Sequence, residues 1–410
     1  MRKAANKGLA VFIFLFLAVF AVSFTISLPA NAMTEQSPDG ATEDPSEAVD
    51  EWVRSQADLV PTDEVEKYWD TLMRKYGGWF PDGNPSFQEA IMPGGKGFSL
   101  SEIGQGLFSF ALHELVVNGK LLALIVILTV FSIVLETLQS AFEKTTVSKI
   151  AFAITYMVLA VLAINSFNVA IGYAKDAISG MIHFMMAVIP VVLTMLASLG
   201  NVATVSILHP LIVFMIHTVG NLIYFFVFPL LFFSAVLHIV STLTDKYKVT
   251  QLAQLLRTVA LGTLTVALTV FLGVISVQGA TGGVADGVTL KTAKYVTGNF
   301  VPVVGRMFSD ATDTVLSASL LLKNAVGIVG VVIIVMLCAF PALKIIVLAF
   351  IFNVGAALLQ PLGDSPIIEC LQTIGKSMIY VFAALATVGL MFFLAITIII
   401  AAGNVSVMIR

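Results

Sequence analysis

Apolar residues follow one another in long runs over the last three hundred residues of this chain, separated by short polar breaks. A helix needs about twenty predominantly apolar residues to cross a bilayer. The pattern therefore predicts an all-α polytopic membrane protein with about 7–9 transmembrane helices. The candidate spans are 121–138, 150–171, 181–199, 205–220, 221–241, 258–278, 325–342, 345–361 and 377–402.

The basic residues between these runs indicate which connections lie on the cytoplasmic side. If residue 33 lies outside the cytoplasm, the breaks at Lys144, Lys246 and Lys344 all fall inside, as the positive-inside rule expects. That agreement favours a hairpin at Gly220-Asn221, which divides one over-long apolar run into two spans. On this count, residues 279–324 lie outside.

The N-terminus predicts a signal peptide over residues 1–32. Basic residues precede the apolar run 9–28, and Ala30-Asn31-Ala32 fits cleavage after Ala32. An uncleaved anchor is the alternative. Either interpretation places residue 33 onward outside the cytoplasm.

Residues 33–98 form an acidic segment, with fourteen of the twenty-five acidic residues and five basic ones. Within it, 33–62 has the composition of a solvated linker, whereas 63–80 has apolar residues at three- and four-residue steps. This spacing predicts an amphipathic helix, whose candidate docking face is Tyr68, Trp69, Leu72 and Tyr76. The face suits a partner or the bilayer interface, or it packs on the protein's own surface. The polytopic domain follows over 99–410 and opens with a helix at about 100–117.

Two proline pairs predict an internal repeat. Pro190 and Pro302 are 112 residues apart, and so are Pro229 and Pro341. The repeat units would be 150–245 and 262–357, although apolar helices resemble one another readily. If the repeat holds, 291–313 corresponds to an apolar span, enters the membrane, and leaves the C-terminus outside.

Two segments differ from the surrounding apolar runs, one by its glycines and one by its charged residues. Gly279, Gly283 and Gly287 have the four-residue spacing that lets helices pack closely, with a flexible loop as the alternative. Charged residues then follow in and before "NFVPVVGRMFSDATDTV". A helix beginning near Pro302 would place Arg306, Asp310 and Asp313 on one stripe, and Lys291 and Lys294 share a face one segment earlier. Charges are costly in hydrocarbon, so these five residues are candidates for lining a conduit or contacting a subunit, or for a solvated external face.

Composition and chemistry exclude several classes. With 58% hydrophobic and 11% charged residues, the chain is not a soluble domain, which carries about 25% charged residues. No basic surface suggests nucleic acid. His113-Glu114 lacks the second histidine of a zinc-protease helix, and the two cysteines, Cys338 and Cys370, form no disulfide framework. We expect no catalytic, cofactor or metal site, and therefore no enzyme.

Several long stretches resemble one family. They are "HELVVNGKLL" (113–122), "TVSKIAFAITYMVLAVLAINSFNVAI" (146–171), "YKVTQLAQLLR" (247–257), "FLGVISVQG" (271–279), "TLKTAKYVTGNFVPVVGRMFSDATDTVLSASLLLKNAVGI" (289–328) and "LLQPLG" (358–363). They are similar to the stage III sporulation protein AE family of endospore-forming bacteria. The resemblance runs from about residue 65 to the C-terminus.

The resemblance implies a subunit of a secretion-like channel complex between mother cell and forespore, in the mother-cell membrane around the forespore. Its implied partners are a cytoplasmic ATPase, ring-forming proteins of the intermembrane space and a forespore-membrane protein. The complex is needed for late forespore gene expression, and no catalytic residues are implied. A self-contained secondary transporter and a structural scaffold are the alternatives. Charges concentrated in one segment favour the conduit or the scaffold.

Overall fold

The computed structural model describes residues 62–80, 85–91, 100–141, 146–243, 249–300, 304–362 and 365–408. Every regular element in these ranges is a helix, which confirms the predicted all-α class. The signal peptide, its cleavage site after Ala32 and the acidic linker up to residue 61 lie outside the described residues.

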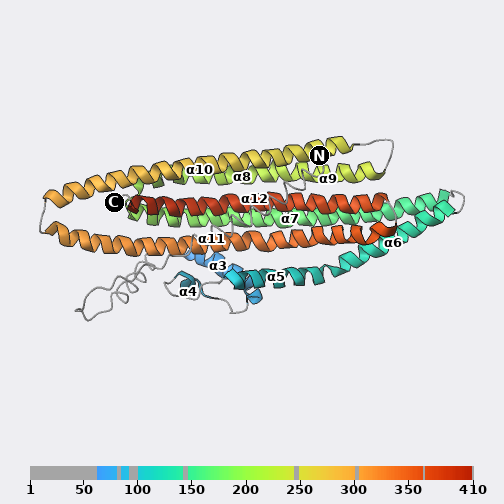
Figure 1. Cartoon of the computed structure of the whole chain (residues 1–410), viewed down its shortest axis with the longest axis horizontal. Helices are drawn as coiled ribbons and strands as arrows, with labels where there is room; N and C mark the ends of the chain where they lie inside the picture. Colours follow the sequence, from blue (N-terminus) through green and yellow to red (C-terminus); the bar gives the residue numbers. More distant parts are fainter. Residues whose placement is uncertain are drawn as a thin grey trace.

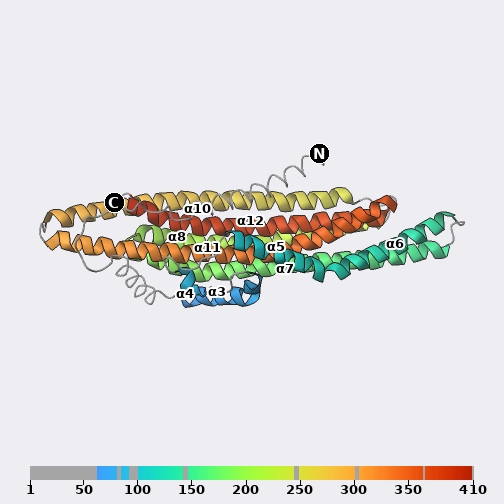
Figure 2. The same cartoon turned by 60° about the horizontal axis from the view of Figure 1, so that its bottom comes forward.

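The helices lie side by side in an elongated bundle (Figures 1 and 2). In chain order they are α3 (Asp63–Tyr76), η1 (Gly77–Trp79), α4 (Phe87–Ile91), α5 (Leu100–Val117), α6 (Gly119–Ala141), α7 (Thr146–Ser198), α8 (Val202–Leu222), η2 (Ile223–Val227), α9 (Phe228–Leu243), α10 (Thr250–Phe300), α11 (Val304–Leu359), η3 (Gln360–Leu362) and α12 (Pro366–Met408).

Helix α12 forms the centre of the bundle because it contacts α7, α9, α10 and α11. Of the long apolar helices it has the largest buried share, 72% of its most apolar window. Its sequence is apolar around its whole circumference, as expected for a helix enclosed by neighbours. Helices α3 and α5 lie outside this group: α3 packs on α7 and α11, and α5 packs on α11 (Figure 1).

The predicted spans merge into fewer and longer helices. The predicted spans 150–171 and 181–199 are both parts of α7, and 325–342 and 345–361 are both parts of α11. Within the described residues, five helices are long and apolar enough to cross a membrane. Counting the pair α5–α6, bent by 41°, as one span makes six. The described residues therefore hold five or six candidate spans, in which several predicted spans are parts of one helix.

The predicted hairpin at Gly220-Asn221 is wrong. Both residues are helical, and a π-helical turn, η2, carries the chain from α8 into α9. A side chain at Gly220 would approach Ile182 Cδ1 to 2.5 Å, so this glycine allows a close approach to α7. The apolar residues before and after the glycine both pack against α7, so the chain continues as a helix and does not turn there.

The helices end alternately at the two ends of the bundle. Helices α7, α10 and α12 end toward one end, and α6, α9 and α11 end toward the other (Figure 1). The predicted repeat stays a prediction. Its 112-residue offset would move the break at 199–201 to 311–313, whereas α11 already begins at Val304.

Glycines bring α11 and α12 into close contact. A Cβ at Gly389 would lie 2.5 Å from the Sγ of Cys338, and one at Gly375 would lie 2.8 Å from Asn353 Nδ2. A Cβ at Gly327 would collide with Ile400. Small residues at such positions are typical of membrane helix interfaces. The packing of the predicted series, Gly279, Gly283 and Gly287, lies outside the described part of the chain, so that prediction stays a prediction.

We expect Gly389→Leu to destabilise the protein by about 1–3 kcal/mol or more, because the added atoms overpack the α11–α12 contact. Thermal unfolding of the purified protein in one detergent measures this loss. Gly172→Ala is the matched control, since nothing lies within 4 Å of a Cβ there. Alanine should be neutral or stabilising at that half-buried helical site, where a methyl group meets no neighbour. Equal behaviour of the two variants would contradict this account of the contact.

Candidate functional site

Helix α3 packs on α7 and α11 (Figure 2), and its ring contacts, Phe184 and Phe340, lie in the second half of each helix. The predicted amphipathic helix is confirmed. Its apolar face is buried, and its outer face carries charged residues, with acidic residues in the first turn and basic residues in the last. This charge order complements the helix dipole. The buried residues are Val65, Trp69, Leu72, Met73 and Tyr76.

The proposed docking face is therefore occupied within the chain. The Tyr68 ring meets Phe184 of α7 edge-on at 5.4 Å, and Tyr76 stacks on Phe340 of α11 at 3.9 Å between ring centroids. Trp69 is 1% exposed and its Nε1–H donates to the carbonyl oxygen of Pro85 at 2.9 Å. The structure favours packing on the protein's own surface over a free face for a partner.

An aromatic cluster joins α3 and η1 to α5 and α11. Phe340 lies at its centre, with Phe110 of α5 edge-on at 4.9 Å and Phe80 at 6.2 Å. Trp79 of η1 contacts both Phe110 and the imidazole of His113. Edge-to-face rings contribute about 0.5–1.5 kcal/mol per pair beyond their burial, so this cluster holds the N-terminal segment on the bundle.

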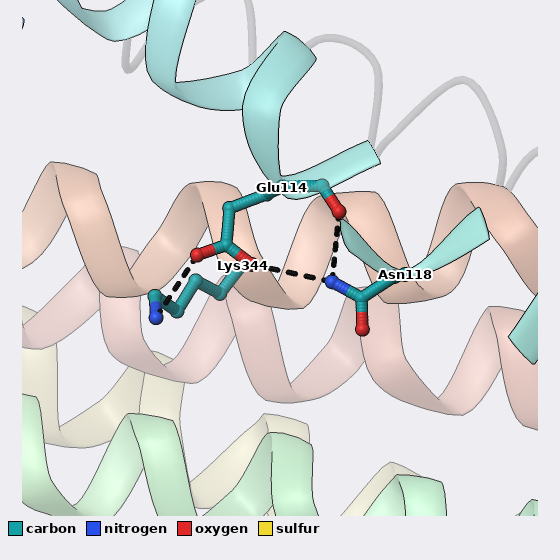
Figure 3. A network of polar contacts seen from close by, with 3 residues as sticks. All are labelled: Glu114, Asn118 and Lys344. Carbon is teal, nitrogen blue, oxygen red and sulfur yellow. Dashed lines mark hydrogen bonds and ion pairs between the residues drawn. The ribbon is translucent and has the colours of Figure 1, made fainter. Parts of the chain in front are cut away.

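One turn beyond Phe340, an ion pair connects α11 to α5 (Figure 3). The Nζ of Lys344 lies 3.0 Å from the Oε1 of Glu114, and the two side chains are only 28% and 12% exposed. The Nδ2 of Asn118 donates to the other carboxylate oxygen at 3.2 Å and to the Glu114 carbonyl at 2.8 Å. Glu114 is thus held from both sides.

Aromatic rings surround the ammonium group of Lys344. It lies 5.2 Å from the ring centre of Tyr173 on α7 and 5.8 Å from that of Phe110. Cation–π contacts of this length compensate for part of the lost hydration of the charge. Burial raises the pKa of Tyr76; nearby Lys344 opposes this rise and Glu114 adds to it, so the phenol stays neutral.

This network forms a joint between four helices. Its groups come from α3, α5, α7 and α11, and its charges neutralise one another inside an apolar bundle. A partly buried pair is costly to break on one side only, because the remaining charge loses its partner. The joint can therefore hold α3 and α5 in place, and its residues show no arrangement of nucleophile and base. In the sequence, Glu114 and Lys344 are visible only as single charged residues within apolar runs. Nothing in the sequence shows that they lie next to each other.

The structure places the candidate conduit residues on helices. Lys291 and Lys294 belong to α10, and Arg306, Asp310 and Asp313 belong to the first turns of α11. A continuous helix over 304–313 brings the last three residues onto one face. Residues 279–287 are helical too, so Gly279, Gly283 and Gly287 are not in a loop. The side chains of 279–318 lie outside the described part of the chain.

A buried lysine was not singled out from the sequence. Lys323 of α11 is fully buried, and its Nζ donates to the carbonyl oxygen of Ile400 in α12 at 3.0 Å. A polar group buried in an apolar interior is costly unless it has such a partner. Among the described residues, no group of three or more histidine, cysteine or acidic side chains is placed to hold a metal ion.

These features define a class: an all-α, multi-pass membrane protein whose N-terminal amphipathic helix is packed on its long apolar helices. A profile of the family described as stage III sporulation protein AE matches residues 84–403. Stage III sporulation protein AE of Bacillus subtilis (strain 168) is 53% identical over 369 residues, covering 90% of this chain and 92% of the relative. The chain belongs to the stage III sporulation protein AE family. No solved structure matches it.

Proposed function

We propose that the chain is a membrane subunit of a secretion-like channel complex that links mother cell and forespore and supports late forespore gene expression. It would lie in the mother-cell membrane around the forespore, with the segment after the signal peptide in the intermembrane space. Its partners would be the cytoplasmic ATPase and ring-forming proteins of the same operon, and a forespore-membrane protein. Membership of a sporulation family supports the setting.

The charged end of the bundle is the observation that carries the conduit role. Helices α10 and α11 meet beyond the end of α12, so that the tip they form extends past the rest of the bundle (Figures 1 and 2). This tip holds Lys291, Lys294, Arg306, Asp310 and Asp313. An exposed pair at i, i+4 contributes only about 0.3–0.5 kcal/mol, so stability alone gives little reason for these charges. A water-filled passage or a charged subunit does.

Arg306→Glu is expected to impair late forespore gene expression strongly while the protein accumulates at its normal level. The change replaces the one positive charge of the stripe by a negative charge, so that all three positions are acidic, without touching the described core. Arg306→Lys keeps the charge and should be milder. Reporter activity in sporulating cells, with immunoblots for protein level, measures both.

The location of the stripe is checked by labelling single cysteines with a membrane-impermeant thiol reagent. Cysteines at 306, 310 and 313 should react and one at 307 should not, because that position lies on another face of the helix. Equal labelling at all four sites, together with normal sporulation of Arg306→Glu, would exclude a role for the stripe.

A further inference from the structure

Helix α7 changes its exposed surface part-way along its length. Its exposed large apolar residues all lie in its first part, where Asn165 and Asn168 are the exposed polar ones; the apolar residues are Ile150, Ile154, Met157, Val158, Val161 and Val169. The exposed residues after this point are Asp176, His183, Pro190, Thr194 and Ser198. The first part suits hydrocarbon, and the second suits water.

The antiparallel neighbour of α7 changes at the same level. In η2 and α9 the exposed residues are Phe225, Phe226, Phe233 and Val240, all apolar. In α8 they are mixed: Val202, Ser206, Ile207, His209, Pro210, Phe214, His217, Thr218 and Asn221. The two changes coincide in space, because the hydroxyl of Tyr224 donates to the carbonyl oxygen of Lys175 at 2.6 Å.

Aromatic and charged residues mark this level. The ammonium of Lys175 lies 5.7 Å from the ring centre of Tyr224, and Lys344, Glu114 and Tyr173 meet in the joint described above. Tyrosine, tryptophan and lysine gather where hydrocarbon meets water in membrane proteins.

Helix α3 lies beside this level, against Phe184 and Phe340, and turns a charged face away from the bundle. Its exposed charged residues are Asp63, Glu64, Lys67, Asp70, Arg74 and Lys75. Each charge at the bilayer centre costs about 2.5–3.5 kcal/mol, so lipid tails do not cover this face.

The length of the apolar belt matches one bilayer. Ile150 to Val169 extends about 29 Å along a helix, against a hydrocarbon core of about 30 Å. The whole apolar helix Ala153–Ser198 has 46 residues, or about 69 Å, which is more than twice that thickness. One bilayer therefore cannot cover all of it.

We propose that hydrocarbon surrounds only the half of the bundle that contains the first part of α7 together with α9. The other half, with the second part of α7, α8 and the charged α10–α11 tip, projects from the membrane as a helical column, and α3 lies at its base. Exposed apolar residues also occur in this column, at Val202, Ile207, Phe214, Val270, Val277, Leu321 and Ile328. On α8 and α10 they alternate with exposed polar residues, and on the described column part of α11 they are only two, seven positions apart. This arrangement holds whatever the role in sporulation, and it places the charged tip in water outside the membrane, where a subunit or an aqueous passage can meet it.

Spin labels on the full-length protein in phospholipid nanodiscs test the proposal. Single cysteines are placed at Val161 and Thr194 of α7 and at Phe233 and His209 of α9 and α8, with the buried Cys338 and Cys370 replaced by alanine. On α7, and likewise on the continuous run of α8 and α9, one label thus lies in the apolar belt and a matched one lies in the column. We expect 161 and 233 to be more accessible to oxygen, which partitions into lipid, and 194 and 209 to a water-soluble nickel chelate. A column position that behaves like its belt partner would overturn the proposal.

Electron cryo-microscopy of the same nanodiscs separates a projecting column from a water-filled cavity within the membrane. Asp176 to Ser198 corresponds to about 33 Å of helix, so helical density of about that length should protrude from one face of the disc. A bundle contained within the disc would refute the column, even if the labels at positions 194 and 209 were accessible to the water-soluble nickel chelate.

Discussion

Trp69→Ala is expected to release α3 from the bundle, with a loss of about 3–5 kcal/mol, the usual cost of truncating a buried large aromatic residue. Trp69 is almost completely buried, and its indole N–H has a backbone partner in Pro85. The substitution therefore removes ring packing and leaves the Pro85 carbonyl without this donor. Because α3 is attached through its apolar face, the loss should appear mainly as detachment of the helix.

Limited proteolysis of the purified protein measures this effect, since a released α3 is cleaved faster between residues 62 and 99. Trp69→Phe keeps the ring but not the hydrogen bond, so it should lie between wild type and alanine. Lys67→Ala, on the exposed face of the same helix, is the matched control. If Trp69→Ala is cleaved no faster than Lys67→Ala, the burial described for α3 is wrong.

Breaking the Glu114–Lys344 pair on one side should cost about 3 kcal/mol, whereas removing both charges should cost much less. Each single change, Glu114→Leu or Lys344→Leu, leaves a poorly hydrated charge among Phe110, Tyr173 and Tyr76. The double variant removes both charges and fills the space with apolar groups. For buried pairs such replacement is often neutral or stabilising.

A double-mutant cycle on thermal or denaturant unfolding, all in one detergent, measures the coupling between these residues. Lys120→Leu, at an exposed lysine of α6, controls for the general effect of removing a charge. Additive losses in the double variant would show that the two charges do not stabilise each other, and that this pair does not hold α5 on α11.

Much of the fold was predictable from local sequence. Apolar runs bounded by lysines predicted membrane helices, and the spacing of Trp69 and Tyr76 predicted an amphipathic helix, because helix formation and amphipathicity are properties of neighbouring residues. The division into spans was not predictable in this way. Gly220-Asn221 has the composition of a turn, yet it is helical because it packs on Ile182.

The candidate site shows the same division. The charged stripe of Arg306, Asp310 and Asp313 follows from helical periodicity, so its common face could be predicted. The pairing of Glu114 with Lys344 could not, since the two residues are far apart in sequence and no local pattern connects them.

The sequence by itself determined that this is an all-α membrane protein with an amphipathic helix near its N-terminus, since these properties depend on composition and on spacing within single helices. Only the tertiary structure decided how many helices result, that α3 packs inward on α7 and α11, and that Lys344 meets Glu114. The physical reason is that these outcomes depend on which surfaces face each other across the bundle. Close packing and the pairing of charges in an apolar interior choose among arrangements that the local sequence leaves equally acceptable.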